Sequence, residues 1–127
     1  MFVGDHMTKK EVEGIKTVSP DTSIMEAWRA LNENNIRRLP VLRANKLVGI
    51  ITQGDLQEAK ASDANSLSIY ELNYLLNETA VDQVMTENPI TIAPSETLDQ
   101  AALLMRENKV GGLPVQEDGD LVGIITE

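Results

Sequence analysis

The 127 residues include no cysteine, one histidine, one tryptophan, one phenylalanine and two tyrosines. Without cysteine the chain can form neither a disulfide nor a thiolate nucleophile, and a single histidine cannot build a zinc site of the usual type. No apolar run approaches the length of a membrane span, and the first residues lack the basic-then-apolar pattern of a signal peptide. These absences predict a cytoplasmic protein without a membrane segment.

Positive charge is also scarce. Eleven lysines and arginines stand against 20 acidic residues, which gives a net charge of −9. Nonspecific nucleic-acid binding requires clustered positive charge, so nucleic acid is not an expected partner.

Catalytic motifs are missing as well. There is no Walker loop, no Gly-x-Ser-x-Gly elbow and no zinc-binding spacing. The acidic stretch 117–120 could imitate a metal loop, but it falls at an expected hairpin tip and is better explained as a solvated turn. We therefore predict that the chain is not an enzyme and holds neither a metal nor a catalytic cofactor.

The main positive feature is an internal repeat. Residues 39–53, LPVLRANKLVGIITQ, return as residues 113–127, LPVQEDGDLVGIITE, with nine of fifteen positions identical at an offset of 74. Met7-Thr8 and Met85-Thr86 repeat at an offset of 78. The difference predicts a longer loop around Gly14 in the first copy.

Each copy predicts the order β-α-β-β-α. Short strands are expected at 15–18 and 90–92, followed by amphipathic helices that begin in capping boxes at Ser23/Glu26 and Thr97/Gln100. These helices should end near the asparagines at 34–35 and 108, where a left-handed residue is tolerated. Hairpins follow at 39–52 and 113–126, and a further helix begins at Gly54.

The domain organisation follows from the repeat: a first domain at 1–60, a linker with a connecting helix at 61–78, and a second domain at 79–127. Within the linker, 61–65 should be polar, and a capping box at Ser68 should open a helix that runs to Asn77. The fold class is α+β, with two pseudo-symmetric repeats that share one core, because each half alone is near the size where a core is marginal. The second copy stops before its last helix, and we expect more chain, such as an attached C-terminal domain, after Glu127.

A strand that runs directly into a helix suggests an anion site. Thr52 would lie beside the unpaired N–H groups of the helix N-terminus and could donate to a phosphate, while Asp55 could accept from ribose hydroxyls. Gly49 and Gly54 would let the backbone approach the ligand closely. The alternative is that Thr52 and Asp55 only cap the helix.

Arg37 and Arg38 are the only adjacent arginines in this acidic chain. Arginine forks onto phosphate oxygens, so we interpret the pair as a phosphate clamp. The alternative is that Arg37 and Arg38 are two solvated charges at a helix end. The matching positions in the second copy are Gly111 and Gly112, which makes the predicted site asymmetric.

The repeated Met-Thr pairs, the Leu-Pro-Val triplets and the stretch Gly49–Asp55 resemble a tandem pair of CBS domains, the Bateman module. The connecting segment is similar to that of acetoin-utilisation regulatory proteins. The resemblance implies a regulatory, energy-sensing module that binds AMP, ADP or ATP between the repeats, and a homodimer formed through the CBS helices. Two alternatives remain open: a ligand-free dimerisation scaffold, and a pair that binds S-adenosylmethionine or a dinucleotide.

The resemblance also implies the residues of the two sites. The main nucleotide site would comprise Arg37, Arg38, Ile50, Thr52, Asp55, Val84, Met85, Val110, Gly111, Gly112, Leu113 and Pro114. A second, weaker site would comprise His6, Met7, Ile36, Pro40, Ile124 and Thr126, together with Arg37. His6 would pack there or reach a ligand phosphate, and Met7 and Met85 are equally well explained as core residues.

Overall fold

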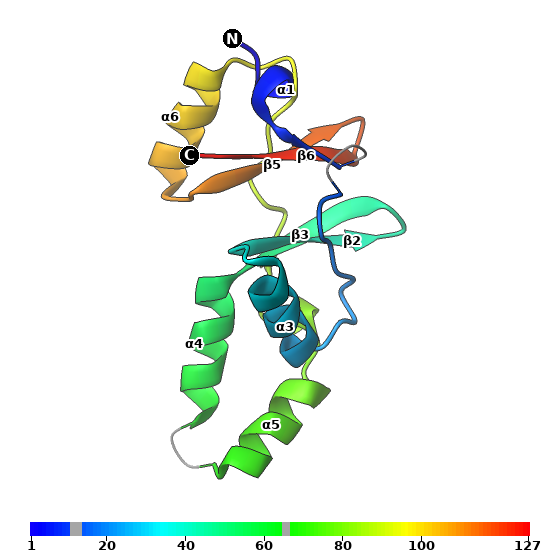
Figure 1. Cartoon of the computed structure of the whole chain (residues 1–127), viewed down its shortest axis with the longest axis vertical. Helices are drawn as coiled ribbons and strands as arrows, with labels where there is room; N and C mark the ends of the chain where they lie inside the picture. Colours follow the sequence, from blue (N-terminus) through cyan, green and yellow to red (C-terminus); the bar gives the residue numbers. More distant parts are fainter. Residues whose placement is uncertain (11–13, 65–66) are drawn as a thin grey trace. The chain divides into compact units, whose positions relative to one another are not determined.

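A computed structural model describes the chain at residues 1–10, 14–64 and 67–127 (Figure 1). The contacts divide it into two compact units, and each unit takes its parts from both sequence repeats. Unit 1 consists of Met1–Ile15, Asn45–Leu47 and Pro89–Glu127, and unit 2 consists of Lys16–Ala44 and Val48–Asn88. The Met-Thr segment of each copy therefore folds with the hairpin of the other copy, whereas the boundaries proposed from sequence follow the repeats themselves.

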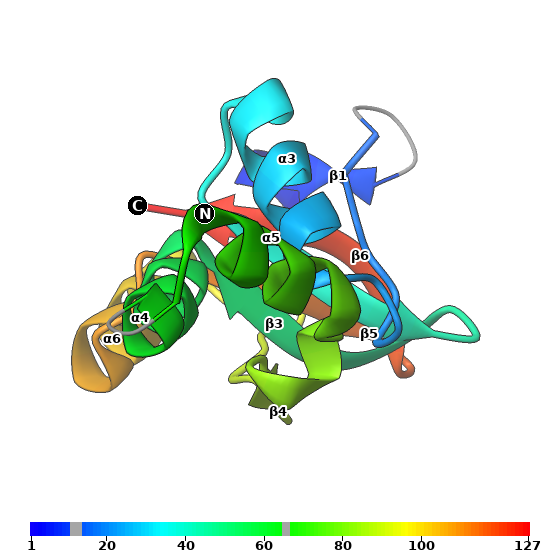
Figure 2. The same cartoon turned by 90° about the horizontal axis from the view of Figure 1, so that it is seen from below.

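Unit 2 combines a small antiparallel sheet with three helices. Strand β3 (Lys46–Thr52) lies between β2 (Arg38–Arg43) and β4 (Thr86–Glu87). Helices α3 (Ile24–Asn34), α4 (Gln53–Ala64) and α5 (Ile69–Glu78) pack on one another. Figure 2 shows the same three helices from below. A 3-10 turn, η1 (Val81–Gln83), lies between α5 and β4.

Unit 1 repeats the sheet arrangement of unit 2. Strand β6 (Asp120–Thr126) lies between β5 (Gly112–Glu117) and β1 (Thr8–Lys9), and both pairings are antiparallel. Helix α1 (Val3–His6) precedes β1, and α6 (Leu98–Asn108) precedes β5. The expected mixed α+β fold is confirmed.

The two short strands expected before the first helix of each copy do not form. Val18 and Ile92 make only isolated parallel bridges, to Val41 and Val115 respectively. The N–H of Val18 donates to the carbonyl of Pro40 at 3.1 Å, and the N–H of Leu42 donates to the carbonyl of Val18 at 2.9 Å. A proline two residues after each bridge residue, Pro20 and Pro94, begins a turn and prevents the ladder from continuing.

The helix termini follow the sequence closely. The hydroxyls of Ser23 and Thr97 each accept from the backbone N–H three residues on, at 3.1 Å in both cases. The reciprocal bond of a full capping box is described at Ser68, whose N–H donates to Glu71. Helix α3 ends on left-handed Asn35, and α6 ends on left-handed Lys109, one residue beyond the predicted asparagine.

The helix that begins at Gln53 runs into the segment predicted as a polar linker, 61–65. Helix α4 continues through Ala64, and Asn65 lies outside the described residues. Alanines at 59, 61 and 64 have the highest helix propensity of any residue, which outweighs the polar residues between them. The connecting helix itself is confirmed as α5.

In place of the single shared core, the buried apolar side chains form two clusters. One belongs to unit 2 and includes Leu39, Ile51 and Leu56, and the other belongs to unit 1 and includes Val3, Leu113 and Val115. Each cluster also takes one fully buried valine from the exchanged N-terminal segments, Val81 in unit 2 and Val3 in unit 1.

Candidate functional site

The junction of β3 and α4 holds Thr52 and Asp55 in a reciprocal pair. The N–H of Thr52 donates to Oδ2 of Asp55 at 3.0 Å, and the N–H of Asp55 donates to Oγ1 of Thr52 at 3.1 Å. Both side chains are half-buried. This is a capping box with threonine at the N-cap position, so the capping role is present in the structure. It also leaves Oδ1 of Asp55 and the hydroxyl proton of Thr52 outside the pair.

The arginine pair lies next to this junction. The N–H of Gln53, the first residue of α4, donates to the carbonyl of Arg37 at 2.8 Å. The side chain of Arg37 is exposed and that of Arg38 is half-buried. Two guanidinium-bearing residues therefore adjoin a helix N-terminus, where the dipole favours an anion.

Met85 packs against the strand that leads to the junction. A Cβ atom added at Gly49 would lie 2.5 Å from Sδ of Met85 and 2.9 Å from the carbonyl oxygen of Thr86. Ile50 pairs with Thr86 across the strands, and Val84 is half-buried nearby in sequence. The close approach predicted at Gly49 thus accommodates Met85, whereas Gly54 has no atom closer than 3.7 Å to such a Cβ.

Unit 1 has an equivalent backbone bond and an equivalent contact between a methionine and a glycine, but with different side chains around them. The N–H of Glu127 donates to the carbonyl of Gly111 at 3.1 Å, which matches the bond from Gln53 to Arg37. Gly123 meets Met7 as Gly49 meets Met85, with 2.5 Å between Sδ and an added Cβ. Ile124 pairs with Thr8.

The residues predicted from sequence fall in both units. Unit 2 contains Ile36, Arg37, Arg38, Pro40, Ile50, Thr52, Asp55, Val84 and Met85, and unit 1 contains His6, Met7, Val110, Gly111, Gly112, Leu113, Pro114, Ile124 and Thr126. In unit 2, Thr52 and Asp55 meet at the junction of β3 and α4, where Gln53 is bonded to Arg37. The side chains of Pro40, Leu113 and Pro114 are fully buried, whereas Val110 and His6 are exposed.

Unit 1 has an open groove of about 610 Å³ between α6 and the β5–β6 hairpin. Its walls are Leu98, Ala101, Ala102, Met105, Arg106, Lys109, Val110, Gly111, Ile125, Thr126 and Glu127. In unit 2 the matching apolar residues, Ile24, Ala27, Leu31 and Ile51, pack in one cluster with Leu56 of α4. The groove is therefore the surface that α4 covers in the other repeat.

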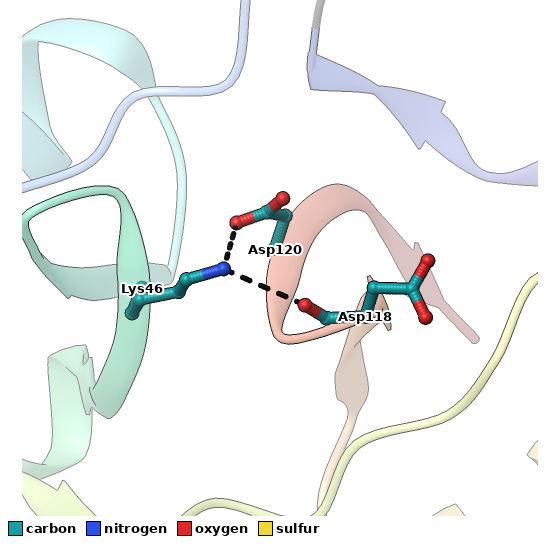
Figure 3. Close-up of polar contacts among 3 residues, drawn as sticks. All are labelled: Lys46, Asp118 and Asp120. Carbon is teal, nitrogen blue, oxygen red and sulfur yellow. Dashed lines mark hydrogen bonds and ion pairs between the residues drawn. The ribbon is translucent and has the colours of Figure 1, made fainter.

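Sequence reasoning missed an ion pair between two turns. Nζ of Lys46 lies 2.7 Å from Oδ1 of Asp120 and 3.5 Å from the carbonyl oxygen of Asp118 (Figure 3). Lys46 and Asp120 also face each other as strand partners. The available signal was the opposite charge at positions 74 residues apart.

The part of the chain that the structure describes contains no group of three or more histidine, cysteine or acidic residues suited to a metal ion. Among the same residues, no helix combines the length and the apolar character needed to cross a bilayer.

Known sequences identify the fold. The family model of the CBS domain matches residues 3–62 and 81–127. A CBS domain-containing protein of Dictyostelium discoideum is 38% identical over 112 residues, which cover 87% of this chain and 77% of that protein. Inosine-5′-monophosphate dehydrogenase of Korarchaeum cryptofilum is 37% identical over 116 residues, 91% of this chain but only 21% of the enzyme.

Solved structures agree with the sequences. The CBS domain pair of protein MJ0100, in complex with 5′-methylthioadenosine and S-adenosyl-L-methionine, matches with a TM-score of 0.80, 33% identity and coverage of 99% of this chain and 89% of that one. CBSX2 in complex with AMP matches with a TM-score of 0.81, 34% identity and coverage of 99% and 90%. An acetoin utilization protein, AcuB, of Vibrio cholerae matches with a TM-score of 0.81, 32% identity and coverage of 99% and 85%.

The fold and its repeated junctions define a tandem pair of domains of one family. The chain belongs to the CBS domain family, and the resemblance drawn from its motifs is confirmed.

Proposed function

We propose that this CBS pair is a regulatory sensor of adenosine nucleotides, AMP, ADP or ATP. The observation that carries the proposal is the position of Arg37 and Arg38 beside the capped start of α4. A scaffold that binds no ligand has no use for two adjacent arginines at a helix N-terminus in a chain of net charge −9.

Each group has a defined role in the proposed complex. The guanidinium groups form paired hydrogen bonds to phosphate oxygens. The hydroxyl of Thr52 donates a hydrogen bond to another phosphate oxygen. Oδ1 of Asp55 accepts from the ribose hydroxyls, while Oδ2 remains bonded to the N–H of Thr52. The capping box holds both side chains in place before the ligand arrives, which lowers the entropy cost of binding.

Adenine would pack on aliphatic side chains, because aromatic residues are few. In unit 2 we assign this role to Ile50, Val84 and Met85. The weaker second site would use the corresponding residues of unit 1, which include His6, Met7, Ile124 and Thr126.

Relatives support an adenosine ligand but differ in its class. CBSX2 was solved with AMP, and the pair from MJ0100 with two adenosine derivatives that carry no phosphate. S-adenosylmethionine or a dinucleotide is therefore the second candidate. A sulfonium ligand would be repelled by the arginine pair, and this favours the nucleotide.

Occupancy would be transmitted by linkage. A ligand that favours one arrangement of the two repeats shifts the affinity for an attached domain or partner by the same factor. The chain spans 21% of the length of the dehydrogenase that it matches.

A thermal-shift panel of AMP, ADP, ATP, adenosine, S-adenosylmethionine and NAD tests the proposal. A ligand that binds only the folded state raises the melting temperature once its concentration passes its Kd. We expect shifts with the phosphorylated adenosines, and a double Arg37→Ala, Arg38→Ala variant should lose those shifts far more than the shift with adenosine. Equal losses for all ligands would refute the phosphate clamp, and no shift with any ligand would favour the dimerisation scaffold.

A further inference from the structure

Helix α5 lies in the longest stretch of the chain without positive charge. Residues 61–105 hold seven acidic residues and no lysine, arginine or histidine. The helix packs on α3 and α4 (Figure 2), and it buries Leu72 and Leu76 in unit 2. Its other side bears Tyr70 and Tyr74, which are 83% and 69% exposed. Two exposed aromatic rings therefore belong to a segment whose only charges are negative.

Tyr74 stands at the centre of the exposed face of α5. Residues three and four apart are neighbours on a helix, so Tyr70, Glu71 and Glu78 all adjoin Tyr74. At about 100° per residue, these four residues occupy about 100° of the helix circumference, with the two glutamates next to each other. Both glutamates are exposed. The face is therefore mixed, with aromatic rings flanked on one side by carboxylates.

A shallow groove of about 410 Å³ adjoins the same face. It is lined by Leu67, Tyr70, Glu71, Tyr74 and Leu75. The two leucines are half-buried. The groove therefore offers apolar contact directly beside the carboxylates.

The carboxylates of this face can accept a cation. Within the part of the chain that the structure describes, neither Glu71 nor Glu78 forms an ion pair. Oε1 of Glu71 accepts from the N–H of Ser68 at 3.4 Å, as part of the capping box of α5. This bond orients the carboxylate of Glu71 and does not use its other oxygen.

One side chain matches rings, carboxylates and groove together. A guanidinium group stacks on an aromatic face and makes two parallel hydrogen bonds to a carboxylate, whereas a lysine ammonium matches the charge but not the planar geometry. An aliphatic side chain next to the arginine would fill the apolar groove. Phosphate groups of nucleic acids or lipids would be repelled by the glutamates.

We propose that this face of α5 binds an arginine-bearing basic segment of a partner protein, with a guanidinium group stacked on Tyr74 and bonded to Glu71 and Glu78. The proposal goes beyond nucleotide sensing, because none of these residues belongs to the nucleotide sites assigned above. It names the chemistry of a partner that the acidic chain can recognise.

NMR titration of the isotope-labelled chain with synthetic peptides tests the proposal. The probe is Gly-Arg-Leu-Gly-Arg-Leu-Gly, and its counterparts carry lysine or glutamate in place of both arginines. We expect amide shifts confined to residues 67–78 and their contacts in unit 2. The arginine peptide should bind at least about threefold more tightly than the lysine peptide, because only arginine stacks and pairs in one plane. The glutamate peptide should cause no shifts.

Equal affinities for the arginine and lysine peptides would overturn the proposal. Shifts that fall outside unit 2, or no shifts with the arginine peptide, would do the same. Affinity should also fall as salt is raised from about 50 to 300 mM, because exposed charges are screened. An affinity that is independent of salt would contradict the role of the glutamates.

Two variants separate the ring from the carboxylates. Tyr74→Leu keeps apolar bulk but removes the ring, and should weaken the arginine peptide about two- to fivefold. Glu71→Gln with Glu78→Gln should remove the preference for the basic peptides. Glutamine still completes a capping box, so the melting temperature should stay unchanged.

The matched control is Glu96→Gln with Glu107→Gln. Both glutamates are exposed in unit 1, and their loss changes the net charge by the same amount. This variant should bind the arginine peptide as the wild type does, and an equal loss in both double variants would mean that binding follows net charge alone. The thermal shift with AMP should be the same in all these variants, so failure of this proposal is distinguishable from failure of the sensor function.

Discussion

Lys46 and Asp120 occupy the same position in the two sequence repeats, 74 residues apart, and they are bonded to each other with 2.7 Å between Nζ and Oδ1. A residue that pairs with its own repeat equivalent would face an identical charge if the two copies had remained identical. Here the two copies carry opposite charges at this position, so the pair is attractive.

The strength of this ion pair can be measured by a double-mutant cycle of Lys46→Met and Asp120→Asn. Both side chains are more than half exposed, at 56% and 57%. Exposed pairs contribute about 0.2–1 kcal/mol, so we expect a coupling energy below about 1 kcal/mol in urea unfolding. The coupling should shrink further in 1 M salt because of screening, and a value that is unchanged by salt would contradict the exposed setting.

Substitution of Gly49 or Gly123, the two glycines that contact a methionine, should destabilise the chain. Gly49→Ala and Gly123→Ala each place a Cβ atom 2.5 Å from a methionine sulfur and within 3.0 Å of a backbone oxygen. Overpacking of this kind costs about 1–3 kcal/mol, and we expect a loss of that order in the free energy of unfolding for each variant.

Gly54→Ala is the control for these two variants. Its nearest atom is 3.7 Å away and the residue lies in α4, so alanine should be neutral or stabilising there. If Gly54→Ala destabilised the chain as much as Gly49→Ala does, close packing would not be the cause.

The hairpin turn at Ala44 should be improved by glycine. Ala44 has φ of 49°, in the left-handed region, and forms a turn with left-handed Asn45. This conformation costs an L-residue about 1–2 kcal/mol, part of which glycine recovers despite its larger unfolded entropy. Ala44→Gly should therefore raise the melting temperature, whereas Ala61→Gly, on the exposed side of α4, should lower it.

Asp55→Ala separates the capping and binding roles of the carboxylate. Loss of the bond to the N–H of Thr52 should lower the stability of the ligand-free chain by about 1 kcal/mol, and the proposed binding of nucleotide should also be lost. Thr97→Ala removes a comparable cap from α6 and should lower stability by a similar amount, yet leave nucleotide affinity unchanged. Retained nucleotide affinity in Asp55→Ala would show that the carboxylate only caps the helix.

The sequence was most informative where a local pattern determines a local structure. The periodicity of α3 and α6, the capping residues Ser23 and Thr97, and the Asp118-Gly119 turn all predicted elements that the structure contains. The junction of Thr52 with Asp55 was also predictable, because a three-residue spacing at a helix start leaves few other geometries.

Features that depend on distant parts of the chain were not predictable in this way. Nothing in the residues around Gly49 indicates that Met85, rather than a ligand, approaches it. The segments at 15–18 and 90–92 make one bridge each, from Val18 to Val41 and from Ile92 to Val115, and both partners are distant in the sequence.

Because the N-terminal segments are exchanged, neither repeat contains all the residues of its own folded unit. Val3 and Val81 stand 78 residues apart in sequence, and each is fully buried in the cluster built mainly by the other repeat. A cut between the repeats would leave both fragments without one buried valine and one edge strand. The first nine residues therefore contribute to the stability of the chain's last third, to which they add a buried side chain and a strand.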